Sequence, residues 1–212
     1  MKLDLWSGNT ATVNVSERVR AISLRAANRT ADEADTPAPI REALELIPGR
    51  YQNATLRSCE APKDVLYWEP AQAWCLGILG PLAAGKTHLA TAIWASQVRK
   101  LGGGLWWDTQ DLIARARWAI KEEKESELVA ELVDTEILLL DDLGRQRETE
   151  YSHETLTLAI RGRCNRKIPT IWTSNLSAEG LLDWDDAVAS RLTAATDTLL
   201  HLMPDNKWRN PK

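Results

Sequence analysis

The chain has 212 residues, of which 26 are Lys or Arg and 30 are Asp or Glu, so its formal net charge is −4. This length suits one large domain, or one domain with a short appendage. The small negative charge excludes a global basic footprint for nucleic acid, so any contact with DNA has to be local.

The cysteines and the hydropathy of the chain indicate which classes of protein are excluded. Cys59, Cys75 and Cys164 lie far apart and form no C-x-x-C pair, which argues against a disulfide framework and against a zinc site. The chain begins without a signal peptide, and no apolar run approaches the roughly 18 residues that a membrane span needs. We therefore expect a cytoplasmic protein without a membrane contact.

The aromatic composition is unusual, because the chain has ten tryptophans and no phenylalanine. Trp106, Trp107 and Trp172 stand where a smaller aromatic ring is expected. Overfilled cores lose stability, so we expect a consequence for packing and infer nothing about function.

The N-terminal part is polar and weakly patterned. We interpret residues 1–44 as a tail, a partner-binding segment and a linker, with Ser16 as a candidate helix N-cap and a disordered tail as the alternative. Residues 39–47 predict a short helix that a Pro-Gly pair ends, and residues 50–72 predict irregular structure.

From residue 73 onward, apolar strands alternate with amphipathic helices. The predicted strands cover residues 73–79, 105–107, 137–142, 168–175 and 198–202. Helices are predicted from the loop after the first strand to Leu101, from a Thr109 cap onward, over about 151–165, and as two short helices before the last strand. The acidic stretch 122–136 is typical of a solvated helical face. This alternation predicts a three-layer α/β fold with a central parallel five-stranded sheet and a ligand at the carboxyl ends of its strands.

A glycine-bearing loop follows the first predicted strand. The pattern G-x-x-x-x-G-K-[ST] is matched by Gly80, Pro81, Leu82, Ala83, Ala84, Gly85, Lys86 and Thr87, and His88 continues into a helix. In such a loop, backbone N–H groups converge on phosphate oxygens at a helix start whose dipole favours anions. Lys86 can reach the β- and γ-phosphates, and the Thr87 hydroxyl can bind Mg²⁺. We predict that residues 80–88 bind ATP with Mg²⁺.

Two acids end the third predicted strand. Four aliphatic residues lead into Asp141 and Asp142. Asp141 is placed to hold Mg²⁺, usually through water, and Asp142 to polarise the water that attacks the γ-phosphate. The alternative is a pair of acids that merely caps a strand end, and the phosphate loop before it disfavours that interpretation.

Three further side chains are candidates for the same site. Asn175 follows the next strand, where a neutral amide can orient water without competing for the metal, although Asn is common at such turns anyway. Arg191 and Arg209 can each meet negative charge that develops on a transferred phosphate. A surface salt bridge is the alternative for both arginines.

Four segments carry a resemblance to a known family. Gly-Lys-Thr-His-Leu-Ala (85–90), Leu-Leu-Asp-Asp-Leu-Gly (139–144), Pro-Thr-Ile-x-Thr-Ser-Asn-Leu (169–176) and the stretch 47–54 resemble the DnaC/IstB branch of the AAA+ ATPases. That branch contains replicative-helicase loaders and transposition helper ATPases. The resemblance covers about residues 45–212, which we expect to form the AAA+ P-loop ATPase domain.

The resemblance implies roles for the matching residues. Lys86 and Thr87 correspond to Walker A, Asp141 and Asp142 to Walker B, Asn175 to sensor 1, Arg191 to an arginine finger that reaches a neighbouring subunit's nucleotide, and Arg209 to sensor 2. Two departures stand out. Family members usually carry Gly where this chain has Ala83, which hinders a turn with positive φ. The chain also ends soon after Arg209, so no C-terminal helical lid is expected, as is usual in this branch.

A local basic excess is the candidate contact for nucleic acid. Residues 144–169 contain three acids (Glu148, Glu150 and Glu154) and twice as many basic side chains: Arg145, Arg147, Arg161, Arg163, Arg166 and Lys167. The family's ring or spiral assembly contacts single-stranded DNA along its inner face, so these side chains predict sequence-independent phosphate contacts. A helix with scattered arginines is one alternative, and Arg163 facing a neighbouring subunit's nucleotide is another.

The resemblance thus implies an ATPase that forms a homo-oligomer, hydrolyses ATP and loads a replicative helicase onto DNA. An IstB-like transposition helper would differ in its partner, a transposase, and not in its chemistry. A nucleotide-gated binding module with negligible hydrolysis is compatible with Ala83. A small-molecule kinase is disfavoured, because the chain shows adjacent acids and a sensor-like Asn but no evident acceptor pocket or arginine-rich lid.

Overall fold

The structure is a computed structural model that describes residues 36–144, 150–194 and 197–204, with only the backbone described at residues 150–153. The compact unit treated below is Pro37–Lys212, which is separate from Met1–Thr36. The helix cap predicted at Ser16 lies outside the described residues.

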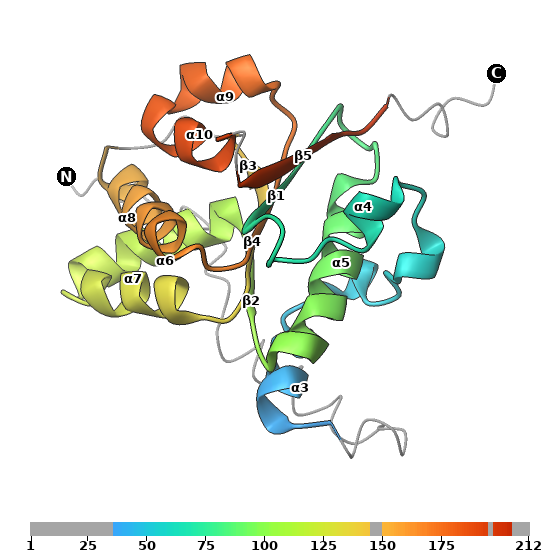
Figure 1. Cartoon of the computed structure of the whole chain (residues 1–212). Coiled ribbons are helices and arrows are strands. Elements are labelled where there is room, and N and C mark those ends of the chain that lie inside the picture. Colours follow the sequence, from blue (N-terminus) through green and yellow to red (C-terminus); the bar gives the residue numbers. More distant parts are fainter. Residues whose placement is uncertain (1–35, 145–149, 195–196, 205–212) are drawn as a thin grey trace, which may run out of the picture. The chain divides into compact units, whose positions relative to one another are not determined.

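A five-stranded parallel sheet forms the centre of this unit (Figure 1). Its strands are β1 (Cys75–Leu79), β2 (Leu105–Asp108), β3 (Leu138–Leu143), β4 (Thr170–Ser174) and β5 (Thr198–Leu202). They lie in the order β2-β3-β4-β1-β5, and every neighbouring pair is parallel. The predicted α/β fold with a parallel five-stranded sheet is confirmed. Because β3, β4 and β1 are consecutive in this order and parallel, the segments that follow these three strands emerge at the same edge of the sheet.

Helices cover both faces of the sheet and complete three layers (Figure 1). One face carries α5 (Lys86–Leu101), with α3 (Ala38–Glu45), α4 (Lys63–Leu66) and the 3-10 turns η2 (Gly49–Tyr51) and η3 (Leu56–Ser58) beside it. The other face carries α6 (Thr109–Lys121), α7 (Glu125–Asp134), α8 (Glu150–Arg166), α9 (Ala178–Trp184) and α10 (Asp186–Leu192). Residues 50–72, which the sequence predicts as irregular, therefore contain η2, η3 and α4.

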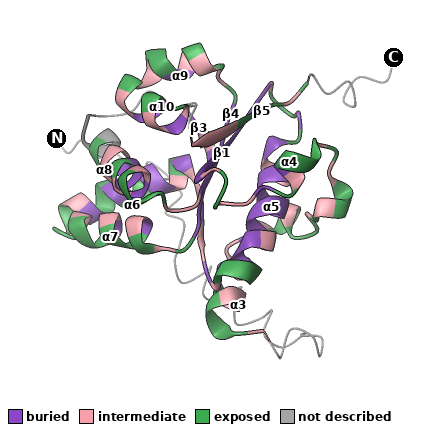
Figure 2. Ribbon diagram, viewed as in Figure 1, coloured by how far each residue is buried: buried purple, intermediate pink, exposed green. Residues whose placement is uncertain are grey.

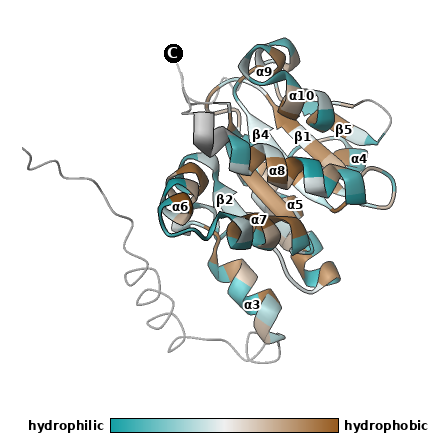
Figure 3. Cartoon of the chain, turned by 90° about the vertical axis from the view of Figure 1, so that its left-hand side faces the viewer, coloured by the Kyte–Doolittle hydropathy of each residue, from teal (hydrophilic) through white to brown (hydrophobic). Residues whose placement is uncertain are grey.

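Two hydrophobic clusters hold the layers together, one on each face of the sheet. Buried residues concentrate on the strands and on the inward sides of the helices (Figure 2). The acidic stretch 122–136 follows the same rule, because α7 buries Leu128 and Leu132 and exposes its glutamates. Hydrophilic residues accordingly lie on the outer sides of the helices (Figure 3). Among the described residues, no helix has the length and apolar character needed to cross a membrane.

Local sequence explains where the main helices begin and end. α5 begins after Gly85 at φ 97° and ends at Gly102 at φ 96°, whose N–H donates to the carbonyl of Val98 at 3.0 Å. Glycine adopts this left-handed conformation without a β-carbon clash. The cap predicted at Thr109 is wrong: the N-cap of α6 is Asp108, whose carboxylate accepts a hydrogen bond from the Gln110 N–H at 2.8 Å.

The start of the ATPase domain, predicted at residue 45, stays a prediction. α3 lies before that position, and its Ala43 is buried in the hydrophobic cluster that contains α5. The packed unit begins at Pro37.

Several tryptophans fill the core, among them Trp68, Trp94 and Trp172, whereas Trp118 is exposed. The indole of Trp172 lies so close to Gly77 that a β-carbon added there would be 2.4 Å from the ring. The indole N–H groups of Trp68, Trp94 and Trp107 are buried without a hydrogen-bond partner among the described residues. A buried donor without an acceptor destabilises a fold by about 1–3 kcal/mol, so these indoles weaken the core that they fill.

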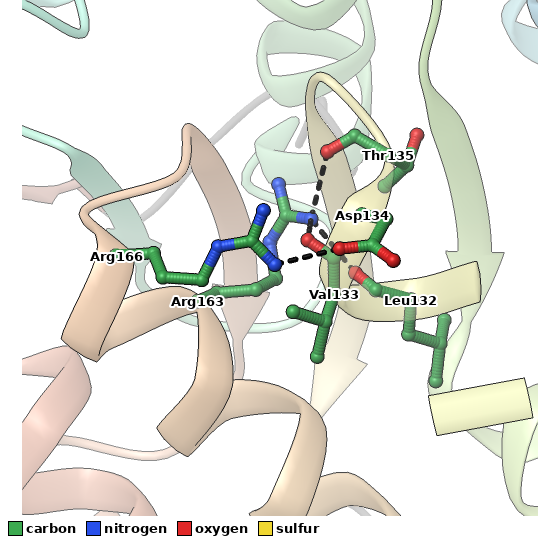
Figure 4. A network of polar contacts seen from close by, with 6 residues as sticks. All are labelled: Leu132, Val133, Asp134, Thr135, Arg163 and Arg166. Carbon is green, nitrogen blue, oxygen red and sulfur yellow. Dashed lines mark hydrogen bonds and ion pairs between the residues drawn. The ribbon is translucent and has the colours of Figure 1, made fainter. Parts of the chain in front are cut away.

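Arg163 joins the ends of three elements on the α8 side of the sheet (Figure 4). Its guanidinium donates to the carbonyls of Leu132 (2.7 Å), Thr135 (3.0 Å) and Pro169 (2.5 Å), and its Nε donates to the Thr170 hydroxyl at 2.9 Å. The residue is fully buried, and this burial lowers the pKa of Arg163 to about 9. Both the predicted DNA contact and the alternative contact with a neighbour's nucleotide are therefore wrong for Arg163, because it is enclosed in its own subunit.

Candidate functional site

The turn that connects β1 to α5 has the backbone of a phosphate-binding loop. Gly80 and Gly85 adopt φ values of 148° and 97°, and a β-carbon at Gly80 would lie 2.8 Å from the carbonyl oxygen of Met203. Ala83 also adopts a positive φ, of 67°, as the resemblance implied for this position. A β-carbon in this conformation raises the energy by roughly 1–2 kcal/mol. The loop thus forms with a strained alanine at the position where the family usually has glycine.

Lys86, the first residue of α5, lies under this loop and is 6% exposed. Its ammonium donates to the carbonyls of Gly80 (2.8 Å) and Pro81 (2.8 Å) and to Oδ1 of Asn175 (2.7 Å). Burial lowers the pKa of Lys86, against the opposing attraction of Asp142 and Asp141. The structure therefore brings Lys86 together with Asn175 and places both aspartates within electrostatic range.

Asp141 ends the buried part of β3 and is 2% exposed. One of its carboxylate oxygens accepts a hydrogen bond from the Thr173 hydroxyl at 2.7 Å, and Thr87 is a second hydrogen-bond partner of its side chain. Burial raises the pKa of Asp141, and the charges of Asp108 and Asp142 add to this effect against the two hydroxyl groups. Thr87 and Asp141, the two predicted metal ligands, thus lie side by side.

Asp142 and Asn175 form the next layer of contacts. Asp142 has a positive φ of 62°, and its N–H donates to the Thr173 hydroxyl at 2.9 Å. The amide nitrogen of Asn175 donates to the carboxylate of Asp142. An unbroken chain of hydrogen bonds therefore runs from Lys86 through Asn175 to Asp142.

Two threonines position Asp141, a role that the sequence did not predict for Thr173 or for Thr109, which was expected only to cap a helix. Thr173 bridges Asp141 and Asp142 from β4, and the Thr109 hydroxyl donates to the carbonyl of Asp141 at 2.8 Å from the start of α6. Both threonines are almost fully buried. The available signal was a hydroxyl residue next to a buried apolar strand, since a buried hydroxyl needs a hydrogen-bond partner.

The remaining predicted site residues lie apart from these contacts. Within the described residues, the Arg191 side chain hydrogen-bonds the carbonyl of Ala187 on its own helix, and Arg209 lies outside the described residues. His88 Nε2 lies 2.9 Å from the Ser58 hydroxyl oxygen, so its ring contacts η3. Leu82 is 75% exposed on the loop, and Ala84 is buried beneath it.

The residues present fit a magnesium ion. Mg²⁺ prefers oxygen ligands and is usually bound through one or two carboxylates together with phosphate and water. The Thr87 hydroxyl and the Asp141 carboxylate supply such oxygens, and the burial and neighbouring charges that raise the pKa of Asp141 are what a cation would offset. In the described parts of the chain, no cluster of three or more His, Cys, Asp or Glu converges on a metal site. A magnesium ion held here would therefore take most of its ligands from phosphate and water.

A second candidate surface lies on the outer side of α6. Trp118 is 43% exposed, and the Arg115 guanidinium carbon lies 4.3 Å from the centre of its ring. Lys124 lies 5.9 Å from the same ring, and Arg117 and Lys121 are exposed on the same helix. None of these cations pairs with a carboxylate of the described residues. We call these five residues the α6 surface.

The basic segment at 144–169 offers less than its composition predicts. Arg166 pairs with Asp134 at 2.6 Å, and Lys167 pairs with Asp197 at 2.9 Å. Arg163 is buried, and Arg145 and Arg147 lie outside the described residues. Among the described residues, the α6 surface is therefore the better candidate for contacts with phosphates.

Comparison with sequence relatives points to one family. Residues 54–204 match the family described as IstB-like ATP binding protein. The chain is 30% identical over 126 residues to the ATP-binding protein of insertion sequence IS21 from Pseudomonas aeruginosa, and 30% identical over 125 residues to that of IS5376 from Geobacillus stearothermophilus. These matches cover 58% of the chain and 46% and 48% of the relatives, so the chain spans about half the length of the curated relatives it matches.

Solved structures agree with this fold. The DnaC helicase loader superposes with a TM-score of 0.60 at 25% identity, over 73% of this chain and 99% of that one. DnaA from Aquifex aeolicus with bound AMPPCP superposes with a TM-score of 0.63 at 20% identity, over 77% of this chain and 52% of that one. The chain belongs to the IstB-like ATP-binding proteins and has the fold of the DnaC/IstB-like AAA+ ATPases.

Proposed function

We propose that this protein hydrolyses ATP with Mg²⁺ and uses the bound nucleotide to load a replicative helicase onto DNA. The observation that carries the nucleotide chemistry is the meeting of Lys86, Asn175 and Asp142 directly behind a phosphate-binding loop. A hydrogen-bonded Lys–Asn–Asp chain at the carboxyl edge of a parallel sheet suits phosphoryl transfer to water.

Each residue has a task in this proposal. The loop amides and Lys86 hold the β- and γ-phosphates, while Thr87 and Asp141 would hold Mg²⁺. When bound, the metal neutralises charge on the phosphate oxygens. Asp142 accepts the proton of the attacking water, and Asn175 orients that water.

Completion of the site from a second copy is part of the proposal. Arg191 lies on α10, and within the described residues its one side-chain hydrogen bond goes to the carbonyl of Ala187 on the same helix. Its guanidinium is therefore available to meet the γ-phosphate of a neighbouring copy, as an arginine finger does. Arg209 would meet the phosphates from its own chain. We expect hydrolysis to be slow in monomers and to rise on assembly.

The α6 surface supports contact with single-stranded DNA. Bases stack on exposed aromatic side chains, and Lys or Arg near the ring bind the phosphates without regard to sequence. Trp118 with Arg115, Arg117, Lys121 and Lys124 supplies both parts of such a surface. The net charge of −4 then does not oppose binding, because the positive charge is local.

Nucleotide binding and turnover are tested with two variants. Lys86→Ala is expected to weaken ATP binding, because the phosphates lose their cation. Asp142→Asn is expected to retain binding and to lower turnover by about 10²–10⁴-fold, the usual contribution of a general base. Calorimetric titration measures binding, and phosphate release measures turnover. Lys100→Ala, a surface lysine paired with Glu69, is the control. A Lys86→Ala protein with wild-type binding and hydrolysis would contradict the proposal.

The partner is the second question, and a transposition helper remains the competing function. The insertion-sequence relatives favour a transposase as partner, whereas the match over 99% of the DnaC helicase loader favours a helicase. A pull-down with purified helicase and purified transposase, each with ATP and with ADP, separates the two. Tight ATP binding with no turnover, even with DNA and the captured partner added, would instead indicate a nucleotide-gated binding module.

A further inference from the structure

The hydrogen-bond capacity of Lys86 is fully used within the chain. An ammonium group has three N–H donors and no acceptor. The three acceptors are the carbonyls of Gly80 and Pro81 at 2.8 Å each and Oδ1 of Asn175 at 2.7 Å. A phosphate oxygen can therefore accept a hydrogen bond from Lys86 only when one of these three acceptors leaves.

The three acceptors are not equally able to leave. Gly80 and Pro81 belong to the loop itself, and the N–H of Gly80 is bonded to the carbonyl of Ser174 at 3.3 Å. Asn175 contributes only a side chain, which lies at the exposed end of β4 and can turn about its own bonds. Asn175 is thus the acceptor that a phosphate displaces most easily.

Both ends of the Asn175 amide are committed. Its oxygen accepts from Lys86, and its nitrogen donates to the Asp142 carboxylate. Because lysine can only donate and an ionised carboxylate can only accept, the orientation of the amide is fixed by its two partners. A movement of Lys86 toward a phosphate therefore changes what Asn175 can offer to Asp142 and to water.

We propose that Asn175 competes with the γ-phosphate for Lys86 and thereby makes the water-orienting group available only once the nucleotide has bound. This inference rests on the proposed function. In the absence of a γ-phosphate, Asn175 holds Lys86. When a γ-phosphate accepts the hydrogen bond from Lys86, Oδ1 of Asn175 is released and accepts a hydrogen bond from the attacking water, while Nδ2 stays on Asp142. No covalent bond changes in this exchange. Asn175 is a positioning residue that lowers ATP affinity and raises the coupling of binding to hydrolysis.

Variants at Asn175 test this competition, because loss of the side chain should strengthen nucleotide binding. Asn175→Ala removes the competitor, so the affinity for AMPPCP, a non-hydrolysable ATP analogue, should rise about fivefold, the factor of one hydrogen bond of ordinary net strength. Turnover of ATP should fall in the same protein. Asn175→Leu retains the side-chain shape without the hydrogen bonds to Lys86 and Asp142, and its affinity and turnover should change as in Asn175→Ala. Isothermal titration of the full chain with AMPPCP in Mg²⁺ buffer measures the affinity, and thermal melting shows that both variants fold.

The matched control is Asn165→Ala, which removes an exposed asparagine of α8 and should leave both quantities unchanged. Weaker or unchanged AMPPCP binding in both Asn175 variants would overturn the competition, even if turnover falls. The Lys86→Ala result decides the proposed function separately, because a loss of binding there with no gain at Asn175 would retain the ATPase and reject only this inference.

Discussion

Ala83 carries the sharpest local conflict in the phosphate-binding loop. Its φ of 67° is a left-handed conformation that the loop demands and that a β-carbon opposes. Neighbouring Ala84 is buried, and its φ is not positive. Adjacent alanines in one loop therefore experience opposite constraints, and this difference can be measured.

Ala83→Gly is expected to stabilise the protein by about 0.5–1 kcal/mol. Relief of the left-handed strain contributes roughly 1–2 kcal/mol, and the greater freedom of glycine in the unfolded chain offsets about 0.4–1 kcal/mol of it. ATP affinity should rise as well, since the loop no longer has to be held against strain. Urea unfolding and calorimetric titration measure the two effects. Ala84→Gly is the control and should lower stability, so equal changes in both variants would refute the assignment of strain to Ala83.

Asp141 links stability to pH at the same site. Its pKa is raised in the folded state by burial first and by Asp108 and Asp142 after that. A carboxyl group with a raised folded pKa binds its proton more tightly when folded, so its contribution to stability is complete below the unfolded value of 3.8 and is lost as pH rises through the folded pKa.

Asp141→Asn is therefore expected to melt at a higher temperature than the wild type at pH 7, with a difference that shrinks as the pH is lowered toward 4. The neutral amide mimics the protonated carboxyl group, to which the wild type itself converts in acid. Melting curves in Mg²⁺-free buffer at several pH values measure this difference. A gap that is constant with pH would show that burial of the charge is not its source.

At the scale of elements, Arg163 connects α8 to the end of α7 (Figure 4) and to the start of β4. It lies on α8, and its guanidinium reaches carbonyls at the end of α7 and the residues that begin β4. The end of β4 in turn places Thr173 against Asp141. A buried cation remote from the phosphate-binding loop thereby supports the alignment of the strands that carry the candidate site.

Arg163→Met should destabilise the fold by about 3 kcal/mol or more, because several buried acceptors lose their donor at once. Arg163→Lys retains a cation but has fewer N–H donors, so its free energy of unfolding should lie between those of the wild type and of Arg163→Met. Denaturant unfolding gives the free energies, and Arg161→Met on the exposed side of α8 is the control, with an expected change within about 0.5 kcal/mol. A small effect at Arg163 would mean that water replaces its contacts.

At the scale of the whole molecule, positive and negative side chains are unevenly distributed among the helices. The chain is acidic in total, yet the α6 surface holds Arg115 and Lys124 over an exposed indole and exposes Arg117 and Lys121 on the same helix. The adjacent α7 exposes glutamates instead. Contact with a polyanion is thereby directed to one helix.

Trp118→Ala is expected to weaken binding of single-stranded DNA by about 5- to 150-fold, since stacking of one base contributes about 1–3 kcal/mol. Arg117→Ala should weaken binding more uniformly and reduce the salt dependence by about one phosphate contact. Fluorescence anisotropy with labelled oligonucleotides at several salt concentrations measures both. Tyr67→Ala removes an exposed aromatic residue elsewhere and serves as the control. Unchanged binding after Trp118→Ala would move the DNA contact away from α6.

The sequence by itself predicted the parallel sheet, which the structure confirms, and it named the residue types of the candidate nucleotide site. Long apolar runs that end in Gly80, Asp141 and Asn175 predict buried strands with functional ends, because apolar periodicity and loop chemistry are local signals. The resemblance to the DnaC/IstB branch, whose members usually carry glycine at this position, pointed to a positive φ at Ala83, and the structure has it.

Only the tertiary structure decided which polar side chains meet. Strand order places β4 between β1 and β3, and this order alone brings Asn175 between Lys86 and Asp142. Arg163 shows the converse. The basic excess of residues 144–169 predicted that it contacts DNA, but packing encloses it in the core. Exposure and partnership depend on segments distant in sequence, so a local pattern can name the residue types of a site but not the contacts that make it work.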